Sequence, residues 1–149
     1  MIFLGADHAG FQTKQAIKVK LLEIKKSFID LGTNSEKPLV DYPDYAQLVA
    51  EKVKEKAQNQ GILICGSGTG MCIAANKIKG IRASVAWDEY TAQKSREDNN
   101  ANILCLSGRD TPIKEAVKIA EIWLNSIFSE KERYQKRLNK IKKIEESRN

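Results

Sequence analysis

The sequence contains few of the residues that mark secreted, metal-dependent or membrane-spanning proteins. It has three cysteines and one histidine among 149 residues, and no two of the cysteines form a C-x-x-C pair. An odd number of unpaired thiols argues against a disulfide framework and against a zinc site. The apolar start of the chain, Met1–Gly5, is too short for a signal peptide or a membrane span. We therefore expect a cytoplasmic protein without a metal or another cofactor.

The composition that is present is that of an ordinary globular protein, with 42% hydrophobic and 30% charged residues. A chain of this length is expected to form one domain, residues 1–149. Its net charge of +6 is uneven, because the segment 129–149 holds eight Lys or Arg and four Glu, which makes +4. Such a basic segment fits nucleic acid, and it fits equally a helix that presents arginines to a phosphorylated small molecule.

Apolar stretches alternate with helical patterns along the whole chain. We expect strands at 1–6, 27–31, 61–65, 82–86 and 102–106. We expect helices at 11–25, 43–57, 69–78, 89–98, 112–128 and 131–146. The alternation predicts an α/β fold, a three-layer α/β/α Rossmann-like domain with a five-stranded parallel sheet and an extra C-terminal helix within 129–149.

Two of these helices have a predicted apolar face. In the helix 11–25 the candidates include Ile17, Val19, Leu21 and Leu22. In the helix 131–146 the candidates are Tyr134, Leu138, Ile141 and Ile144. We expect each face to pack against other apolar surface.

The segment 61–76 combines a buried strand, a glycine-rich turn and the start of a helix. The turn consists of Gly66, Ser67, Gly68, Thr69 and Gly70. Backbone N–H groups at such a place can hold an anion. The turn does not match a dinucleotide fingerprint or a triphosphate-binding loop, and a plain tight turn is the alternative.

Cys65 lies where this strand meets the turn. The positive end of the following helix favours its thiolate, which would make it a base or a nucleophile. The alternative is that Cys65 is a small buried apolar residue, which we expect of Cys72 and Cys105.

The C-terminal ends of parallel strands form the usual ligand site, at the point where the strand order reverses. If the strands 1–6 and 61–65 flank that point, Asp7 and His8 face Cys65 and Gly66 across a crevice. His8 could then bind sugar hydroxyls or pass a proton, although a surface imidazole is the alternative.

Three arginines are candidates for holding a phosphate. Arg133 and Arg137 are four residues apart and share a helix face, and Arg109 follows the strand 102–106. Guanidinium geometry suits a phosphate better than an ammonium group does. Ordinary solvated charge is the alternative for all three.

Several of these segments occur together and in the same order in one known family. They are Gly5–Gly10, Asp41–Tyr45, Cys65–Gly70, Ala75–Lys77, Gly80–Arg82, Asn99–Asn102 and Arg133–Arg137. Over nearly its whole length the chain resembles ribose-5-phosphate isomerase type B, in a family that includes galactose-6-phosphate isomerase. The resemblance implies a cofactor-independent aldose–ketose isomerase that converts ribose 5-phosphate to ribulose 5-phosphate in the pentose phosphate pathway.

The resemblance also implies roles for individual residues. Cys65 would move the proton between C2 and C1 of the sugar, and the turn Gly66–Gly70 would hold the enediolate oxygen. Asp7, His8 and Tyr42 would bind and open the sugar ring, and Asn99 would bind substrate. The phosphate would lie on Arg109, Arg133 and Arg137. Family members are homodimers or homotetramers with active sites shared between subunits, and neither nucleic acid nor membrane is an expected partner.

The chain departs from the family pattern at Asp98, where many type B enzymes have a histidine that opens the furanose ring. Asp98 or His8 could take that role here. The substrate could instead be a hexose 6-phosphate, such as galactose or allose 6-phosphate, because a galactose-6-phosphate isomerase subunit resembles this chain in having aspartate there. An alternative of another class is a non-catalytic module that binds sugar phosphate or nucleic acid.

Overall fold

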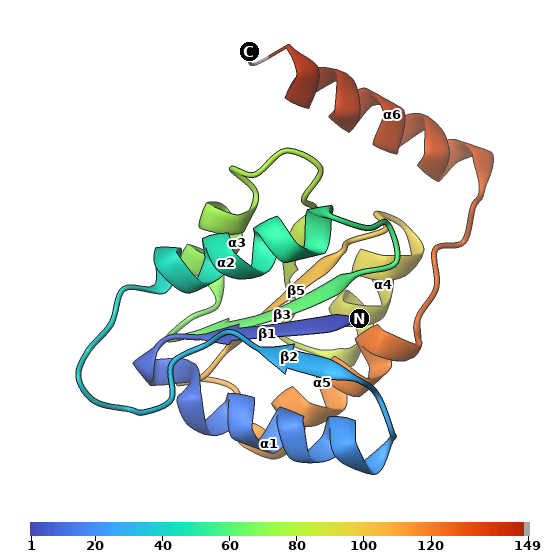
Figure 1. Ribbon diagram of the computed structural model, residues 1–149. Helices are drawn as coiled ribbons and strands as arrows, with labels where there is room; N and C mark the ends of the chain where they lie inside the picture. The colour runs from blue at the N-terminus through green and yellow to red at the C-terminus, as the bar shows by residue number, and fades with distance from the viewer. Residues whose placement is uncertain (148–149) are drawn as a thin grey trace.

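The computed structural model, which describes residues 1–147, has one parallel sheet between two layers of helices (Figure 1). The strands are β1 (Ile2–Ala6), β2 (Phe28–Asp30), β3 (Gln60–Cys65), β4 (Ala83–Val85) and β5 (Ile103–Ser107). The α-helices are α1 (Phe11–Glu23), α2 (Tyr42–Lys54), α3 (Thr69–Ala75), α4 (Glu89–Glu97), α5 (Ile113–Asn125) and α6 (Glu132–Glu146). A short 3-10 helix, η1, spans His8–Gly10. The predicted fold class is confirmed.

The strand order is β2-β1-β3-β5-β4, and all neighbouring strands are parallel. From β1 the chain first adds β2 on one side and then β3 on the other. The order therefore reverses between β1 and β3, which is the condition under which Asp7 and His8 are expected to face Cys65. The register pairs Ala6 with Ile64, so the segments that follow these two strands begin side by side.

Alternate strand residues supply two cores, one on each face of the sheet. One core joins the sheet to α1, α4 and α5, and it contains Trp123 as its largest side chain. The other joins the sheet to α2 and α3, and it contains Cys65 and Cys105. Cys105 is fully buried, as predicted, whereas Cys72 at the edge of this core is only half-buried.

The predicted apolar face of α1 is wrong in part. Val19 is 57% exposed and Leu22 is 67% exposed. The buried positions are Ile17 and Leu21, together with Thr13 and Lys14. The helix therefore buries Lys14 where an apolar side chain would be expected. The Lys14 ammonium group forms an ion pair with Asp30.

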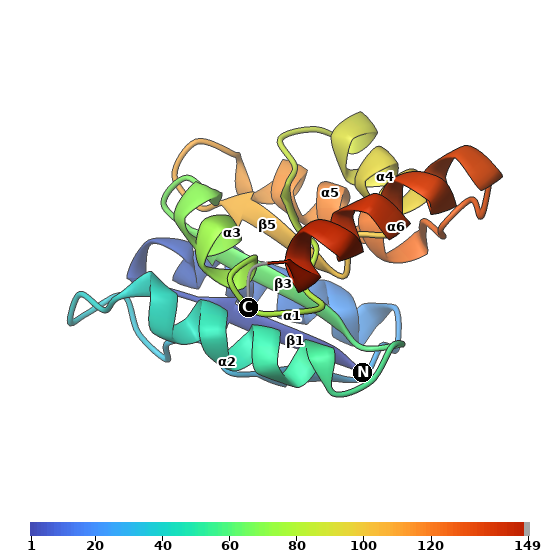
Figure 2. The ribbon, with the colours of Figure 1, turned by 90° about the horizontal axis from the view of Figure 1, so that it is seen from above.

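Helix α6 runs from the end of α4 toward the loop that follows α3 (Figures 1 and 2). Ser129 donates its backbone N–H to the Glu97 carbonyl, and the Gly80 N–H donates to the Glu145 carboxylate at 2.7 Å. Of the predicted apolar face only Tyr134 is buried, and Ile141 and Ile144 are exposed. The C-terminal residues 148–149 of the predicted segment 129–149 lie outside the described residues. No helix within residues 1–147 is long and apolar enough to cross a membrane.

A buried ion pair joins α1 to the end of β2. The Lys14 ammonium lies 2.8 Å from an Asp30 oxygen and donates to the Thr33 carbonyl at 2.6 Å. Lys18 contacts the other Asp30 oxygen at 2.8 Å, and the Gly32 N–H donates to the same carboxylate. Burial raises the pKa of Asp30, but these hydrogen bonds outweigh it, so the pKa lies below its usual value of 3.8.

Asp30→Asn is expected to destabilise the fold by about 2 to 3 kcal/mol, because it leaves Lys14 buried without its counter-charge. Since the folded pKa of Asp30 is depressed, its contribution is complete above pH 3.8 and disappears as the pH falls through the folded value. Urea denaturation at neutral and acidic pH measures both effects. Glu36→Gln, in an exposed loop, is the matched control and should change little. Equal stability of Asp30→Asn and the unchanged protein at pH 7 would contradict this assignment.

Cys72 and Cys105 are close enough for a hydrogen bond, which acts on their pKa values in opposite directions. The bond from Cys105 is the main cause that lowers the pKa of the Cys72 thiol from 9.0 to about 7, and burial opposes it. The Val85 N–H and the Asn76 amide also favour the Cys72 thiolate. Burial, and then the bond to Cys72, raises the pKa of Cys105 well above its usual value. Of these two thiols, Cys72 is therefore the one that ionises more readily.

Alkylation of Cys72 by iodoacetamide is expected to show a pH midpoint near 7, because the thiolate is the reactive form. Cys105→Ala should move this midpoint upward toward 9.0, and Cys65→Ala should leave it in place. Peptide mass spectrometry distinguishes the three thiols. A Cys72 midpoint that is the same with and without Cys105 would show that the hydrogen bond has no such effect.

Candidate active site

The segments that follow β1, β3 and β5 meet at the carboxyl edge of the sheet. The Asp7 N–H donates to the Ile64 carbonyl at 3.3 Å. The Gly108 N–H donates to the Cys65 carbonyl at 2.8 Å, and the Arg109 N–H donates to the Gly66 carbonyl at 3.2 Å. Asp7 and Cys65, far apart in the sequence, therefore lie at adjacent strand ends, as predicted.

Asp7 holds the segment after β1 in place. One of its carboxylate oxygens accepts the N–H groups of Ala9 at 2.9 Å and Gly10 at 3.0 Å, which caps η1. The next residue, His8, is half-buried and its Nδ1 lies 3.2 Å from the Val40 carbonyl. The loop before α2 is thereby attached to the same edge of the sheet.

One residue of the glycine turn, Gly68, has a left-handed backbone conformation that glycine adopts readily and other residues rarely adopt. Gly68 is the N-cap of α3 with a φ of 77°, and a Cβ there would lie 2.9 Å from the Leu106 backbone. Helix α3 begins at Thr69, so the first N–H groups of the helix have no intrahelical acceptor. Within the described residues, the N–H groups of Gly68 and Gly70 donate to no protein acceptor. They remain available to an anionic oxygen.

Tyr42 and Arg109 both contact this turn. A Cβ on Gly70 would lie 2.7 Å from the Tyr42 ring, and one on Gly66 would lie 3.4 Å from the Arg109 guanidinium. Ser67 and Thr69 share a hydroxyl–hydroxyl hydrogen bond of 2.6 Å on the exposed side of the turn. The structure thus brings Asp7, His8, Tyr42, Cys65, the turn 66–70 and Arg109 together at one edge.

Ser107 supports the turn, although the sequence pattern does not single it out. Its hydroxyl donates to the Gly66 carbonyl at 2.7 Å and accepts the N–H groups of Arg109 at 3.3 Å and Asp110 at 3.0 Å. The one signal was its place as a polar residue that ends an apolar strand. It links the segments after β3 and β5 through a single side chain.

Cys65 and Asp7 lie beneath these segments and not on the open surface. Cys65 is 3% exposed and Asp7 is 5% exposed, whereas Tyr42 is 39% exposed. Tyr42, at the start of α2, is an exposed side chain that contacts the glycine turn from outside.

Asp98, Asn99, Arg133 and Arg137 do not join this group in the same chain. Asp98 ends α4 and Asn99 follows it, before β5 begins. Because helix ends and strand starts meet at the amino edge of a parallel sheet, these residues lie at the edge opposite Cys65. A strand of the length of β3 spans about 20 Å, so one chain cannot bring both groups to one small ligand.

Arg133 and Arg137 converge on the buried Tyr134. The Arg133 guanidinium donates to the Tyr134 hydroxyl at 2.6 Å and lies 4.6 Å from its ring centre. The Arg137 guanidinium lies 5.7 Å from the same ring. Within residues 1–147 neither arginine forms an ion pair. The ring holds two cations together that a phosphate could neutralise.

The described part of the chain contains no group of three His, Cys, Asp or Glu side chains arranged to bind a metal ion. The groups at the carboxyl edge include a thiol, the Asp7 carboxylate, the His8 imidazole and the backbone N–H groups of the turn. This set can move a proton and stabilise an oxyanion.

The comparisons with known proteins identify the family and agree with the fold. The family model described as Ribose/Galactose Isomerase matches residues 2–141. The chain is 43% identical to ribose-5-phosphate isomerase B of Escherichia coli, over 99% of this chain and 98% of that protein. It is also similar in structure to the Clostridium thermocellum ribose-5-phosphate isomerase B, with a TM-score of 0.95, 42% identity and 99% coverage of both chains.

A third similar protein carries a ligand. The Mycoplasma genitalium ribose-5-phosphate isomerase B, solved with bound ribulose-5-phosphate, has a TM-score of 0.93 and 42% identity, over 97% of this chain and 95% of that one. The family model covers the sheet, the glycine turn and α6 as far as Ile141, and the match to the Escherichia coli protein covers 99% of the chain. The chain therefore belongs to the ribose/galactose isomerase family.

Proposed function

We propose that this protein interconverts ribose 5-phosphate and ribulose 5-phosphate. The observation that carries the proposal is the meeting of Asp7, Cys65, the glycine turn and Arg109 at the point where the strand order reverses. Family membership and the relative with ribulose-5-phosphate bound support the choice of substrate.

The proposed chemistry is a proton transfer through an enediolate. The Cys65 thiolate takes the proton from C2 of the open-chain aldose, and the C–H electron pair forms the C1–C2 double bond as negative charge moves to O1. The O2 proton then passes to O1 as the C2=O bond forms, and the Cys65 thiol returns its proton to C1, which gives the ketose and restores the thiolate. The N–H groups of Gly68 and Gly70 stabilise the charged oxygen, and each such donor is worth on the order of 10²–10³ in rate.

The remaining residues at this edge bind the sugar. Asp7 and His8 accept and donate hydrogen bonds to its hydroxyls and assist ring opening. Tyr42, which contacts Gly70, covers the turn from the exposed side. Arg109, which contacts Gly66, is the one arginine of the three candidates that reaches this edge within the same chain.

A second copy of the chain completes the site in this proposal. Asp98, Asn99, Arg133 and Arg137 lie at the other edge, about 20 Å away, so they reach a sugar on Cys65 only from another subunit. A homodimer of C2 symmetry would supply the pair of arginines to the phosphate and Asn99 and Asp98 to the sugar at both sites. The exposed Ile141 and Ile144 on α6 provide apolar surface for that contact.

A hexose 6-phosphate is the second candidate substrate. Asp98 is the observation that favours it, because a galactose-6-phosphate isomerase subunit of the family resembles this chain in having aspartate there. His8 or Asp7 would then have to donate the proton that opens a furanose. Comparison of five- and six-carbon phosphates distinguishes the two candidates.

Cys65→Ala is expected to lower kcat/KM for ribose 5-phosphate by about 10³-fold, because it removes the proton-transferring group. Cys72→Ala, which removes a neighbouring thiol from the same side of the sheet, is the matched control. In the unchanged protein kcat/KM should be higher for ribose 5-phosphate than for galactose or allose 6-phosphate. Full activity of Cys65→Ala would eliminate the proposed base, and a preference for a hexose phosphate would favour the second candidate.

Co-expression of Cys65→Ala with Arg137→Ala is expected to restore activity that neither variant has alone. If each site combines Cys65 of one subunit with Arg137 of the other, a mixed dimer has one intact site. Random pairing then gives about a quarter of full activity. The mixed dimer is isolated with two different affinity tags. Isomerase activity no higher in it than in the separate variants would show that each chain builds its own site.

A further inference from the structure

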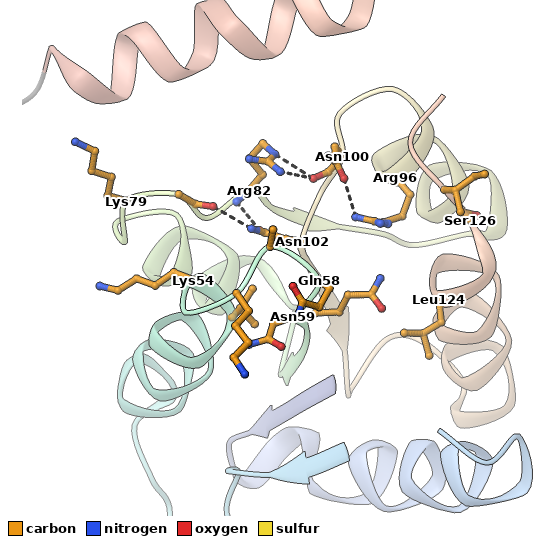
Figure 3. A pocket seen from close by; sticks show the side chains of 16 residues that line it. Lys54, Gln58, Asn59, Lys79, Arg82, Arg96, Asn100, Asn102, Leu124 and Ser126 are labelled. Atoms are coloured by element: carbon orange, nitrogen blue, oxygen red, sulfur yellow. Dashed lines mark hydrogen bonds between the residues drawn. The ribbon is translucent and has the colours of Figure 1, made fainter. Parts of the chain in front are cut away.

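A polar pocket lies at the amino edge of the sheet, opposite the candidate active site. Its volume is about 770 Å³, and it is lined by the segments that precede β3, β4 and β5 and by the end of α5 (Figure 3). This volume falls within the range of small-molecule sites, about 300–1,000 Å³. None of the residues proposed for the isomerase reaction lines it.

All the charged side chains that line the pocket are positive. Lys54, Lys56, Lys79, Arg82 and Arg96 line the pocket, and no Asp or Glu does. Lys54 forms an ion pair with Glu51 outside the lining. Within residues 1–147 the other four cations form no ion pair. The side-chain amides of Gln58, Asn59, Asn100 and Asn102 complete the polar surface.

Backbone carbonyls hold the two arginines in place, as Figure 3 shows for Arg82, Arg96 and Asn100. The Arg82 Nη2 donates to the Asn100 carbonyl at 2.8 Å, and its Nε donates to the Asn99 and Asn100 carbonyls. The Arg96 Nη1 donates to the Ala101 carbonyl at 2.6 Å and to the Asn100 side chain at 3.0 Å. Arg96 also lies over the buried Trp123 ring at 5.4 Å. The guanidiniums are therefore positioned before any ligand arrives.

Within residues 1–147 neither guanidinium forms an ion pair. Burial, followed by the charge of Arg82, lowers the pKa of Arg96, and burial lowers the pKa of Arg82. Glu145 is the one carboxylate that opposes the shift of Arg82, and it already accepts the Gly80 N–H. The buried Arg96 Nε has no hydrogen-bond partner. Burial thus disfavours the charge of both guanidiniums, and no ion pair within residues 1–147 neutralises it. Such a pair of cations is suited to binding an anion.

We propose that this amino-edge pocket binds a small organic phosphate with two or more negative charges, separately from the sugar phosphate on Cys65. The amides and the apolar Leu124 and Ile127 at its margin would contact the organic part. The guanidiniums that would hold the phosphate also fix the carbonyls of Asn99, Asn100 and Ala101, which follow Asp98. The proposal does not depend on the isomerase activity, because it concerns binding at the other edge.

The test is calorimetric titration of the full chain with pyrophosphate as the probe. Lys56→Gln combined with Lys79→Gln should weaken binding roughly tenfold or more, because two of the five positive charges that line the pocket are lost. Lys114→Gln, an exposed lysine on α5 that does not line the pocket, is the matched control and should bind like the unchanged protein. Arg133→Gln combined with Arg137→Gln should keep this binding, because those side chains lie outside the pocket.

Three results would overturn the proposal. The first is no measurable binding of pyrophosphate, and the second is the same affinity with and without Lys56 and Lys79. The third is loss of binding in the Arg133 and Arg137 variant, which would assign the probe to the sugar-phosphate site. Because the readout is binding and not turnover, the Cys65→Ala protein gives the same test whether or not the isomerase proposal holds.

Discussion

The parallel pairing of β1 with β3 is the constraint on which the candidate active site depends. It places Ala6 beside Ile64 and lets the Asp7 N–H donate to the Ile64 carbonyl, so that two segments from distant parts of the sequence leave the sheet together. Since β2 is added on one side of β1 and β3 on the other, no crossover helix covers this point. The glycine turn, Arg109 and the loop with Tyr42 then close around the same strand ends.

We assign different functions to the two edges of the sheet. At the carboxyl edge a single thiol and unpaired N–H groups face the place where a sugar would react. The amino edge and α6 carry arginines that form no ion pair within residues 1–147. A five-stranded sheet keeps these groups about 20 Å apart within one chain. Assembly of two chains is the simplest way for the arginines of α6 to act on a phosphate at Cys65.

Much of the fold could be predicted from the sequence, because uninterrupted apolar strands and short connections leave few arrangements open. The strands, the helices and the reversal between β1 and β3 follow from that pattern. The burial of Lys14 in place of Val19 or Leu22 could not be predicted, because it depends on Asp30 and Thr33, which the fold brings to it. The spacing of apolar residues along α1 does not show that Lys14 is buried, because its ion-pair partner Asp30 comes from another element of the fold.

The candidate site could be predicted only in part, for a similar reason. Asp7, Cys65 and the turn follow strands and were found by that position. Ser107 acts through hydrogen bonds to backbone groups of another segment, and these have no signature in the sequence. No separate role for Arg82 or Arg96 follows from the sequence, because their significance comes from the carbonyls and the pocket around them. The separation of Asp98 and Arg137 from Cys65 likewise becomes visible only with the strand order.

The structure of this protein with ribulose 5-phosphate bound is the most direct test of the central claim. We expect C1 and C2 of the sugar to lie about 3 to 3.5 Å from the Cys65 sulfur, with a sugar oxygen accepting the N–H groups of Gly68 and Gly70. The phosphate should contact Arg109 of the same chain and the pair of arginines from a second copy. A sugar bound at the amino edge, with Cys65 still covered and the glycine turn empty, would contradict the account.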